Sequence, residues 1–330
     1  MIVEKLGEKR ALAAISLATM IICAVGVFID ISVITVAPIA LAIGKKSGYH
    51  KEALLLAMIG GGKAGNIISP NPNTIAVSEA FKVDLTSLMM KNFIPAICAV
   101  VVTILLSTML SKKQGVQVTE NDLEQKGDKN LPSFIQAVAG PVVVVILLAL
   151  RPVASIVIDP LIALPVGGVV CALACGQIKN IREYAEFGLG KVVGVSVLLI
   201  GTGTIAGIIK ASALQYDVVH ILKMANMPAF LLAPIAGILM AGATASTTAG
   251  ATIGAQTFAG TLIKSGVSAL SAGAMVHAGA TVIDSLPHGS FFHATGGAAG
   301  LEIKERMKLI PYEMCVGLTS TVVAVMMYGK

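Results

Sequence analysis

Four apolar stretches of this chain are too long to be single membrane-spanning helices, and each contains polar or helix-breaking residues near its middle. A helix crosses the hydrocarbon of a bilayer with about 20 residues. Lipid offers no hydrogen bonds to the backbone freed by such a break, so the interruptions must face protein or a water-filled cavity. They lie at 28–32 in run 11–44, 69–74 in run 52–81, 244–248 in run 228–263 and 284–290 in run 266–300.

The remaining apolar runs each have the length of one membrane span. Hydrophobic residues make up 55% of the chain and charged residues 13%, about half of the ~25% usual in soluble domains. These values exclude a soluble globular enzyme, a disordered chain and a disulfide scaffold, and they predict an all-α polytopic membrane protein. The five single-span runs are 92–110, 134–150, 153–175, 188–209 and 309–328.

The two halves of the chain repeat each other at a fixed offset. Gly26 and Gly242 are 216 positions apart, as are Ser69 and Ser285, and Asp30 corresponds to Ser246. Both halves also have the same order of long run, break, long run, break and single span. Paired halves with interrupted hydrophobic segments are typical of secondary transporters. We therefore expect an inverted-repeat fold with two re-entrant hairpins and two broken helices.

The distribution of basic residues predicts how these segments cross the membrane. With 24 Lys and Arg against 18 Asp and Glu, the net charge is +6. If run 11–44 is a hairpin entered from the cytoplasm, fifteen Lys and Arg lie in cytoplasmic segments and seven outside, as the positive-inside rule requires. The second hairpin then enters from the opposite face, and the C-terminus lies outside. This pattern favours the inner membrane of a bacterium as the location and gives no sign of nucleic-acid binding.

The expected organisation leaves the first repeat incomplete. Three spans and an amphipathic surface helix over 211–226 precede the second hairpin, and their counterparts would begin about 80 residues before Met1. We expect the incomplete first repeat at 1–111 (hairpin 11–44, broken helix 52–81, span 92–110), a cytoplasmic linker at 112–133 and the second repeat at 134–330 (hairpin 228–263, broken helix 266–300, span 309–328).

Residues 60–66 (GGGKAGN) and 69–74 (SPNPNT) resemble the gluconate:proton symporter, or gluconate permease, family of the ion-transporter superfamily. The resemblance extends over about 11–328 and includes 28–30, 243–250 and 284–292. It implies a two-repeat fold whose hairpin tips and helix breaks bind a small carboxylate, family substrates being sugar acids and related hydroxy acids taken up with protons. The chain has Asn71 where family members often have histidine, and 285–288 (SLPH) where the family has His-x-Asn-Asp.

The residues at the breaks suit an organic anion. Half-helix N-termini present free N–H groups and a positive dipole end, and amide and hydroxyl side chains add donors. Lys63 stands inside an apolar run, where an unpaired charge is costly, so it either attracts the carboxylate or pairs with Asp30 or Asp284. The plainer alternative is that the Ser and Thr residues only cap interrupted helices. The candidate substrate-binding residues are Lys63, Ser69, Asn71, Asn73, Thr74, Ser246, Thr247, Thr248 and Ser285.

Coupling to a cation needs an ionisable group or an oxygen cage. Asp30, Asp284 and His288 are the candidates for the cation-coupling site, with His277 and His293 as further titratable groups. Sodium is the rival ion, because carbonyl and hydroxyl oxygens at unwound breaks suit a hard cation. We therefore expect no cofactor beyond H⁺ or Na⁺.

Two classes of function remain open. The first is a cation-coupled symporter for a small hydroxycarboxylate such as gluconate or hydroxybutyrate, with the lipid bilayer and, from the resemblance, a second copy of the chain as partners. The second is a passive anion channel or a non-transporting membrane subunit. A membrane enzyme is disfavoured, because no nucleophile–base pair or metal-ligand spacing is visible.

Overall fold

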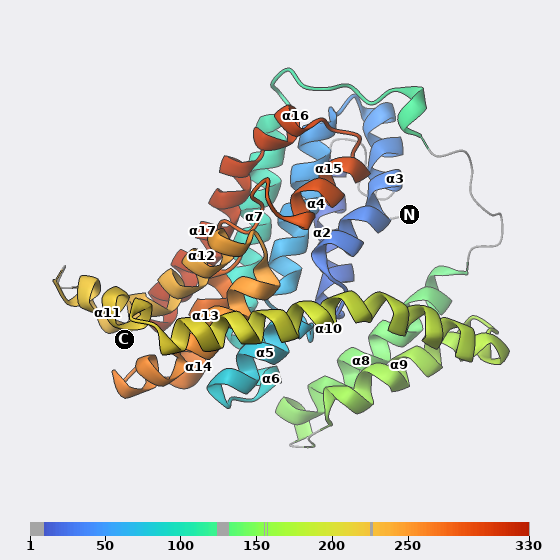
Figure 1. The fold of residues 1–330 in the computed structure, drawn as a ribbon. Helices are drawn as coiled ribbons and strands as arrows, with labels where there is room; N and C mark the ends of the chain where they lie inside the picture. Colours follow the sequence, from blue (N-terminus) through green and yellow to red (C-terminus); the bar gives the residue numbers. More distant parts are fainter. Residues whose placement is uncertain (1–9, 124–131, 155, 157, 225–226, 330) are drawn as a thin grey trace. The chain divides into compact units, whose positions relative to one another are not determined.

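The computed structural model describes residues 10–123, 132–154, 156, 158–224 and 227–329, in which every regular element is a helix (Figure 1). The chain forms two compact units. The first comprises Met1–Glu124 with Thr202–Lys330, and the second comprises Gln125–Gly201. The helical structure agrees with the predicted class.

The first unit contains two series of helices in the same order. The first series is α2 (Ala11–Ala24), α3 (Ile29–Ser47), α4 (Lys51–Asn66), α5 (Pro72–Phe81), α6 (Leu85–Lys91) and α7 (Phe93–Leu110). The second is α12 (Leu232–Thr244), α13 (Thr247–Lys264), α14 (Ala269–Gly279), α15 (Ser290–Ala298), α16 (Ile303–Met307) and α17 (Ile310–Tyr328). Short 3-10 turns lie at Glu120–Asp122 (η2) and Ala229–Leu231 (η4), and α11 (Leu214–Met224) falls in the range of the expected surface helix.

The contacts between helices follow the same correspondence. Helix α2 packs on α3 and α4 as α12 packs on α13 and α14, and α4 packs on α7 as α14 packs on α17. The helices after the two breaks cross over: α5 packs on α13, and α15 packs on α3. Each series therefore places its post-break helix against the hairpin of the other series.

Local sequence explains both breaks. Helix α4 ends at Asn66 because Pro70 and Pro72 follow, and α5 restarts with Pro72 in its first turn, where no N–H is needed. The Asn71 side chain caps α5 by accepting hydrogen bonds from the backbone N–H groups of Asn73 and Thr74. In the second series, helix is absent from 280 to 289, a segment that contains Pro287. The interruptions predicted at 69–74 and 284–290 are thus present.

The two hairpins turn at different kinds of residue. Between α2 and α3 the chain passes through Gly26 with a φ of 115°, which glycine adopts without steric cost. Between α12 and α13 the left-handed residue is Ala245, with a φ of 45°. Gly289 packs directly on Ala245, since a Cβ there would lie 2.4 Å from the Ala245 carbonyl oxygen. The matched Gly26 and Gly242 thus do not share a backbone role.

Glycines allow corresponding helices to pack closely. A Cβ on Gly61 of α4 would lie 2.1 Å from the Ser16 carbonyl oxygen of α2. In the second series, a Cβ on Gly279 of α14 would lie 2.4 Å from the Pro234 carbonyl oxygen of α12. Backbone-to-backbone approach through small residues is the packing mode of helices in membranes. It replaces the hydrophobic driving force, which lipid does not supply.

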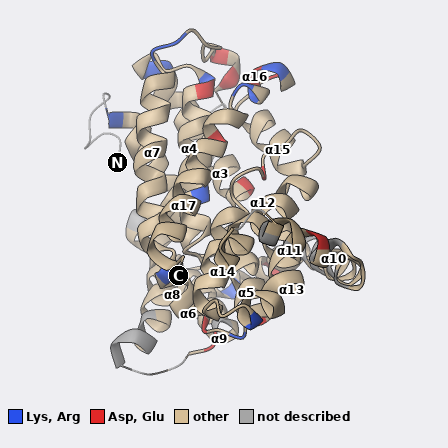
Figure 2. Ribbon diagram, turned by 90° about the vertical axis from the view of Figure 1, so that its left-hand side faces the viewer, with Lys and Arg blue, Asp and Glu red and all other residues tan. Residues whose placement is uncertain are grey.

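Among the described residues, two segments are long and apolar enough to cross a membrane by length and composition, Phe93–Leu110 and Ile303–Tyr328. Helix α7 buries Ala96, Ala99 and Thr103, while its opposite face exposes Val101 and Leu105 at 49% and 58%. An exposed apolar stripe of this kind is expected next to lipid. In the first unit, Lys, Arg, Asp and Glu gather near α16 and the adjacent ends of α3 and α4 (Figure 2).

The second unit consists of α8 (Phe134–Ala154), α9 (Pro160–Ala174), η3 (Ile178–Asn180) and the beginning of α10 (Ile181–Ala211). Its helix bounds differ from the predicted runs. Helix α9 begins at Pro160 rather than 153, because Asp159 caps it and proline occupies its first turn. Arg182, which lies between the predicted runs 153–175 and 188–209, is in α10, and its Nε lies 2.8 Å from Glu186 Oε1 one turn later.

Candidate substrate site at the helix interruptions

Lys63 is the cation at the centre of the polar residues that the breaks bring together. It lies one turn before the end of α4 and is buried, at 2% exposure. Its Nζ is 2.5 Å from Asp284 Oδ1 and donates to the Thr281 carbonyl oxygen at 2.7 Å. Of the two partners that the sequence suggested, the structure selects Asp284. The first series thus contributes the lysine and the second break the carboxylate.

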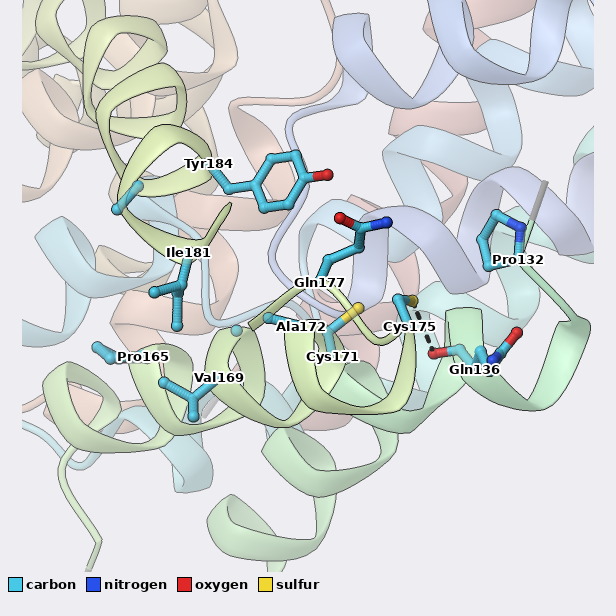
Figure 3. Close-up of a pocket in the computed structure, with 12 residues that line it drawn as sticks. Pro132, Gln136, Pro165, Val169, Cys171, Ala172, Cys175, Gln177, Ile181 and Tyr184 are labelled. Carbon is cyan, nitrogen blue, oxygen red and sulfur yellow. Dashed lines mark hydrogen bonds between the residues drawn. The ribbon is translucent and has the colours of Figure 1, made fainter. Parts of the chain in front are cut away.

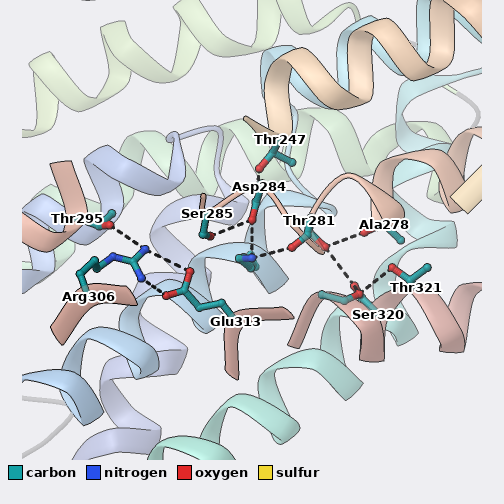
Figure 4. A network of polar contacts seen from close by, with 12 residues as sticks. Thr247, Ala278, Thr281, Asp284, Ser285, Thr295, Arg306, Glu313, Ser320 and Thr321 are labelled. Atoms are coloured by element: carbon teal, nitrogen blue, oxygen red, sulfur yellow. Dashed lines mark hydrogen bonds and ion pairs between the residues drawn. The ribbon is translucent and has the colours of Figure 1, made fainter. Parts of the chain in front are cut away.

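Hydroxyl groups complete the surroundings of Asp284. Thr247, in the first turn of α13, donates to Asp284 Oδ2 at 2.5 Å, and Ser285 donates to Oδ1 at 3.0 Å. Figure 4 shows the Asp284 carboxylate with these two side chains turned toward it. Thr281 Oγ1 lies 3.5 Å from Ser320 Oγ of α17. Three candidate substrate-binding residues and one candidate coupling residue therefore meet in one network.

A second cluster lies at the first break. The Asn71 amide donates to Asn66 Oδ1 at 2.6 Å and to the Asn66 carbonyl oxygen at 2.9 Å, and Asn73 Nδ2 donates to the same Oδ1 at 3.0 Å. Thr74 is buried and donates its N–H to Asn71 Oδ1 at 3.1 Å. Lys63 and Asn66 are three residues apart on α4 and share one side of the helix. The amide cluster and the ion pair therefore adjoin.

The other candidate residues have simpler surroundings. Ser246 caps α13 by accepting from the Ala249 N–H at 3.3 Å, as the capping alternative expected, and Thr248 is buried in the first turn of α13. Ser69 is buried within the first break. Asp30 lies in the first turn of α3 and accepts from the Ile31 N–H, and His288 is exposed. The structure brings neither of these last two into the Lys63–Asp284 network.

Two basic residues that lie between the predicted apolar runs, Lys51 and Arg306, are buried in ion pairs. Arg306 of α16, at 1% exposure, pairs with the fully buried Glu313 of α17 and donates to Thr295 Oγ1 of α15 at 3.3 Å (Figure 4). Lys51 Nζ lies 2.5 Å from Asp122 Oδ1 and 3.1 Å from the Gly300 carbonyl oxygen. The sequence predicted neither pair. Arg306 and Glu313 lie on different helices, and Lys51 and Asp122 are 71 residues apart, so no local pattern relates the partners.

The Lys51 contact belongs to a polar end of the first unit. His50 Nδ1 lies 2.9 Å from Glu52 Oε2, and His50 Nε2 lies 2.9 Å from the Leu110 carbonyl oxygen. Burial works against a charge on His50, but the hydrogen bonds to Glu52 and to the Leu110 carbonyl raise its pKa above the usual 6.5. Burial likewise opposes a charge on Asp122, yet the bonds from Lys51 and Thr119 lower its pKa to about 2.

A cavity of about 780 Å³ lies elsewhere, within the second unit (Figure 3). Its walls come from α8, α9 and the start of α10 and are mainly apolar, with Gln136, Gln177 and Tyr184 as polar exceptions. Cys171 of α9 and Cys175, the residue that follows this helix, both line it, and the Cys175 thiol contacts the Gln136 carbonyl at 3.9 Å. This cavity contains none of the candidate site residues.

The arrangement in the first unit suits a small anion. A single ammonium is held by a carboxylate, with amide and hydroxyl groups around both. A carboxylate that replaced Asp284 at Lys63 would meet the same cation and neighbouring donors.

Comparison with known proteins agrees with a transport role. The chain is 52% identical, over 328 residues, to an uncharacterized transporter of Haemophilus influenzae, an alignment covering 99% of this chain and 78% of that protein.

The family model of the GntP family permeases matches residues 1–328. That range includes both breaks, both hairpin turns and every residue of the Lys63–Asp284 network. The chain therefore belongs to the GntP family of permeases, which are membrane transporters.

Proposed function

We propose that this permease is a proton-coupled symporter that imports a small hydroxycarboxylate of the gluconate type. The observation that carries the proposal is the buried contact between Lys63 and Asp284. A carboxylate substrate needs Lys63, yet the ionised Asp284 occupies it. Protonation of Asp284 would remove that competition, so that the anion binds the protonated carrier better than the unprotonated one. Differential binding of this kind is what couples two ligands.

The repeated helix order supports an inverted-repeat carrier. In this proposal α2–α3 and α12–α13 are re-entrant hairpins that enter the bilayer from opposite faces. The exchange of α5 and α15 between the two series is what a pseudo-two-fold axis in the membrane plane would produce. An inner-membrane location, an external C-terminus and the pairing of two copies are further parts of the proposal.

Sodium coupling is the second candidate, because residues 280–289 lie outside a helix and offer backbone carbonyl and hydroxyl oxygens, which a hard cation prefers. A passive anion pathway is the third candidate.

Reconstituted protein in proteoliposomes distinguishes all three. We expect gluconate to accumulate above equilibrium when the outside is made acidic, with no response to a sodium gradient. Accumulation driven by sodium alone, or uptake that never exceeds equilibrium, would refute proton coupling.

A further inference from the structure

His277 is a buried polar side chain without a partner. It lies in the last turn of α14, just before the second break, and none of its side chain is exposed. Neither ring nitrogen has a hydrogen bond. Leaving buried polar atoms unpaired costs free energy, so such groups in a native protein point to an absent ligand or water.

The first break has unpartnered atoms as well. They are Asn66 Nδ2, Ser69 Oγ and Asn73 Oδ1, all on side chains at most 2% exposed. The other nitrogen and oxygen atoms of these amides are engaged: Asn66 Oδ1 accepts from two side chains, and Asn73 Nδ2 donates to it. The unused atoms therefore include both a donor and an acceptor held in place by neighbouring bonds.

Helix packing directs His277 and Asn73 to the same region. Helix α14 packs on α5 so closely that a Cβ on Gly273 would lie 3.3 Å from side-chain atoms of Val77 and Phe81. The C-terminal end of α14 leads to the second break, and the N-terminal end of α5 follows the first break. Lys63, one turn before the first break, donates to the Thr281 carbonyl oxygen in the second break, so the two breaks are neighbours. The two helices are thus antiparallel. One turn nearer the breaks, on the same faces, come His277 (Gly273 + 4) and Asn73 (Val77 − 4).

We propose that His277 and Asn66, with Ser69 and Asn73, form a subsite for the hydroxyl groups of the transported anion. The inference rests on the proposed function, in which Lys63 binds the carboxylate. A hydroxyl group is both donor and acceptor, and it matches a neutral imidazole, which offers one of each, and the free atoms of two amides. Lys63 and Asn66 lie one turn apart on α4, so the hydroxyl subsite continues directly from the carboxylate subsite.

A two-ligand comparison tests the subsite. Binding of radiolabelled D-gluconate and of hexanoate, which has the same carbon chain without hydroxyl groups, is measured on the purified full chain. We expect His277→Leu to weaken gluconate binding about tenfold, as for one or two lost hydrogen bonds, and to leave hexanoate binding unchanged. His277→Gln, which keeps a donor and an acceptor, should recover part of the preference. The exposed His220 on α11 supplies the matched control, His220→Leu.

The following results would overturn the hydroxyl subsite, the proposed symporter or both. Equal weakening of both ligands by His277→Leu, or no weakening of either, would overturn the subsite. If that variant does not fold, the same comparison with Ser69→Ala decides, and an unchanged preference for gluconate over hexanoate in Ser69→Ala overturns the subsite. Wild-type protein that binds gluconate but does not transport it would refute the symporter while leaving the subsite intact. Wild-type protein that binds neither anion would refute both.

Discussion

Lys63 and Asp284 are 221 residues apart in the chain, and their charged atoms lie 2.5 Å apart in the structure. Both side chains are 1% exposed. A buried pair of this kind is not by itself a source of stability, because the desolvation of two ions offsets their attraction. Removing one partner, however, leaves an uncompensated buried charge. The fold should therefore tolerate both ions or an apolar pair in their place, but not one buried ion alone.

Lys63→Met should therefore destabilise the protein by about 3–5 kcal/mol, and the double variant Lys63→Met/Asp284→Leu should regain most of that loss. Thermal unfolding in detergent measures both. Neither variant should transport, since the cation for the carboxylate is gone. Equal instability of the single and double variants would show that the pair is not energetically coupled.

Asp284→Asn imitates the protonated carboxyl group. In the proposed mechanism Lys63 is then free for the substrate at any pH, so exchange of internal for external gluconate should continue while its pH dependence disappears. Accumulation driven by a pH gradient should be lost. The measurement is counterflow in proteoliposomes at mildly acidic and at mildly alkaline pH. Wild-type pH dependence in the variant would exclude Asp284 as the coupling group.

Asn73→Ala and Ser246→Ala should each impair transport while the protein still inserts into the membrane. Asn73 belongs to the amide cluster of the first break, and Ser246 caps α13 next to Thr247. Loss of the Ser246 cap should also cost about 1 kcal/mol of stability. Thr108→Ala, on the exposed face of α7, is the control. Wild-type uptake in both variants, measured at equal membrane abundance, would remove the two residues from the site.

Arg306→Met should destabilise the protein by about 3–5 kcal/mol, because Glu313 is fully buried and would keep its charge without a partner. The expected cause is local: Arg306 joins α15, α16 and α17 through Thr295 and Glu313. A double-mutant cycle with Glu313→Leu measures the coupling. Additive effects of the two substitutions would contradict it.

The polar end at His50 should respond to pH. Because folding raises the His50 pKa above 6.5, the protonated imidazole stabilises the native contact fully below pH 6.5, and this contribution is lost as pH rises through the raised value. Hydrogen exchange of the segment 111–123, whose Val116 N–H donates to Glu52, should therefore speed up across that range beyond its intrinsic pH dependence. His50→Gln should abolish the additional change. An unaltered profile in the variant would assign the effect to another group.

Local features of the sequence predicted much of this architecture. Pro70 and Pro72 cannot continue a helix, so a break at 69–74 follows from the residues themselves, and α4 and α5 end and begin around it. The matching order of runs anticipated two series of helices. Helix boundaries that depend on a capping residue were predicted less well. Helix α9 starts at Pro160 because Asp159 caps it, although both residues lie inside the predicted apolar run 153–175.

Charge assignments were predicted less well. Lys51 and Arg306 have neighbours typical of cytoplasmic loops, yet tertiary contacts bury both. Asp30 has the same acidic side chain as Asp284, but only Asp284 meets Lys63. The spacing of charged residues in the sequence does not show which of them form ion pairs. The partners are 71 or 221 positions apart, and helical periodicity relates only residues a few positions apart.

Hydropathy and proline act within a few residues, so the amino acids alone predict a helical membrane protein with interrupted hydrophobic segments. Which interruptions meet, which carboxylate pairs with Lys63, and that His277 is buried without a partner just before the second break became visible only in the folded chain. Those outcomes depend on the packing of helices through glycines such as Gly61 and Gly279, and packing joins residues by distance in space rather than by position in the chain.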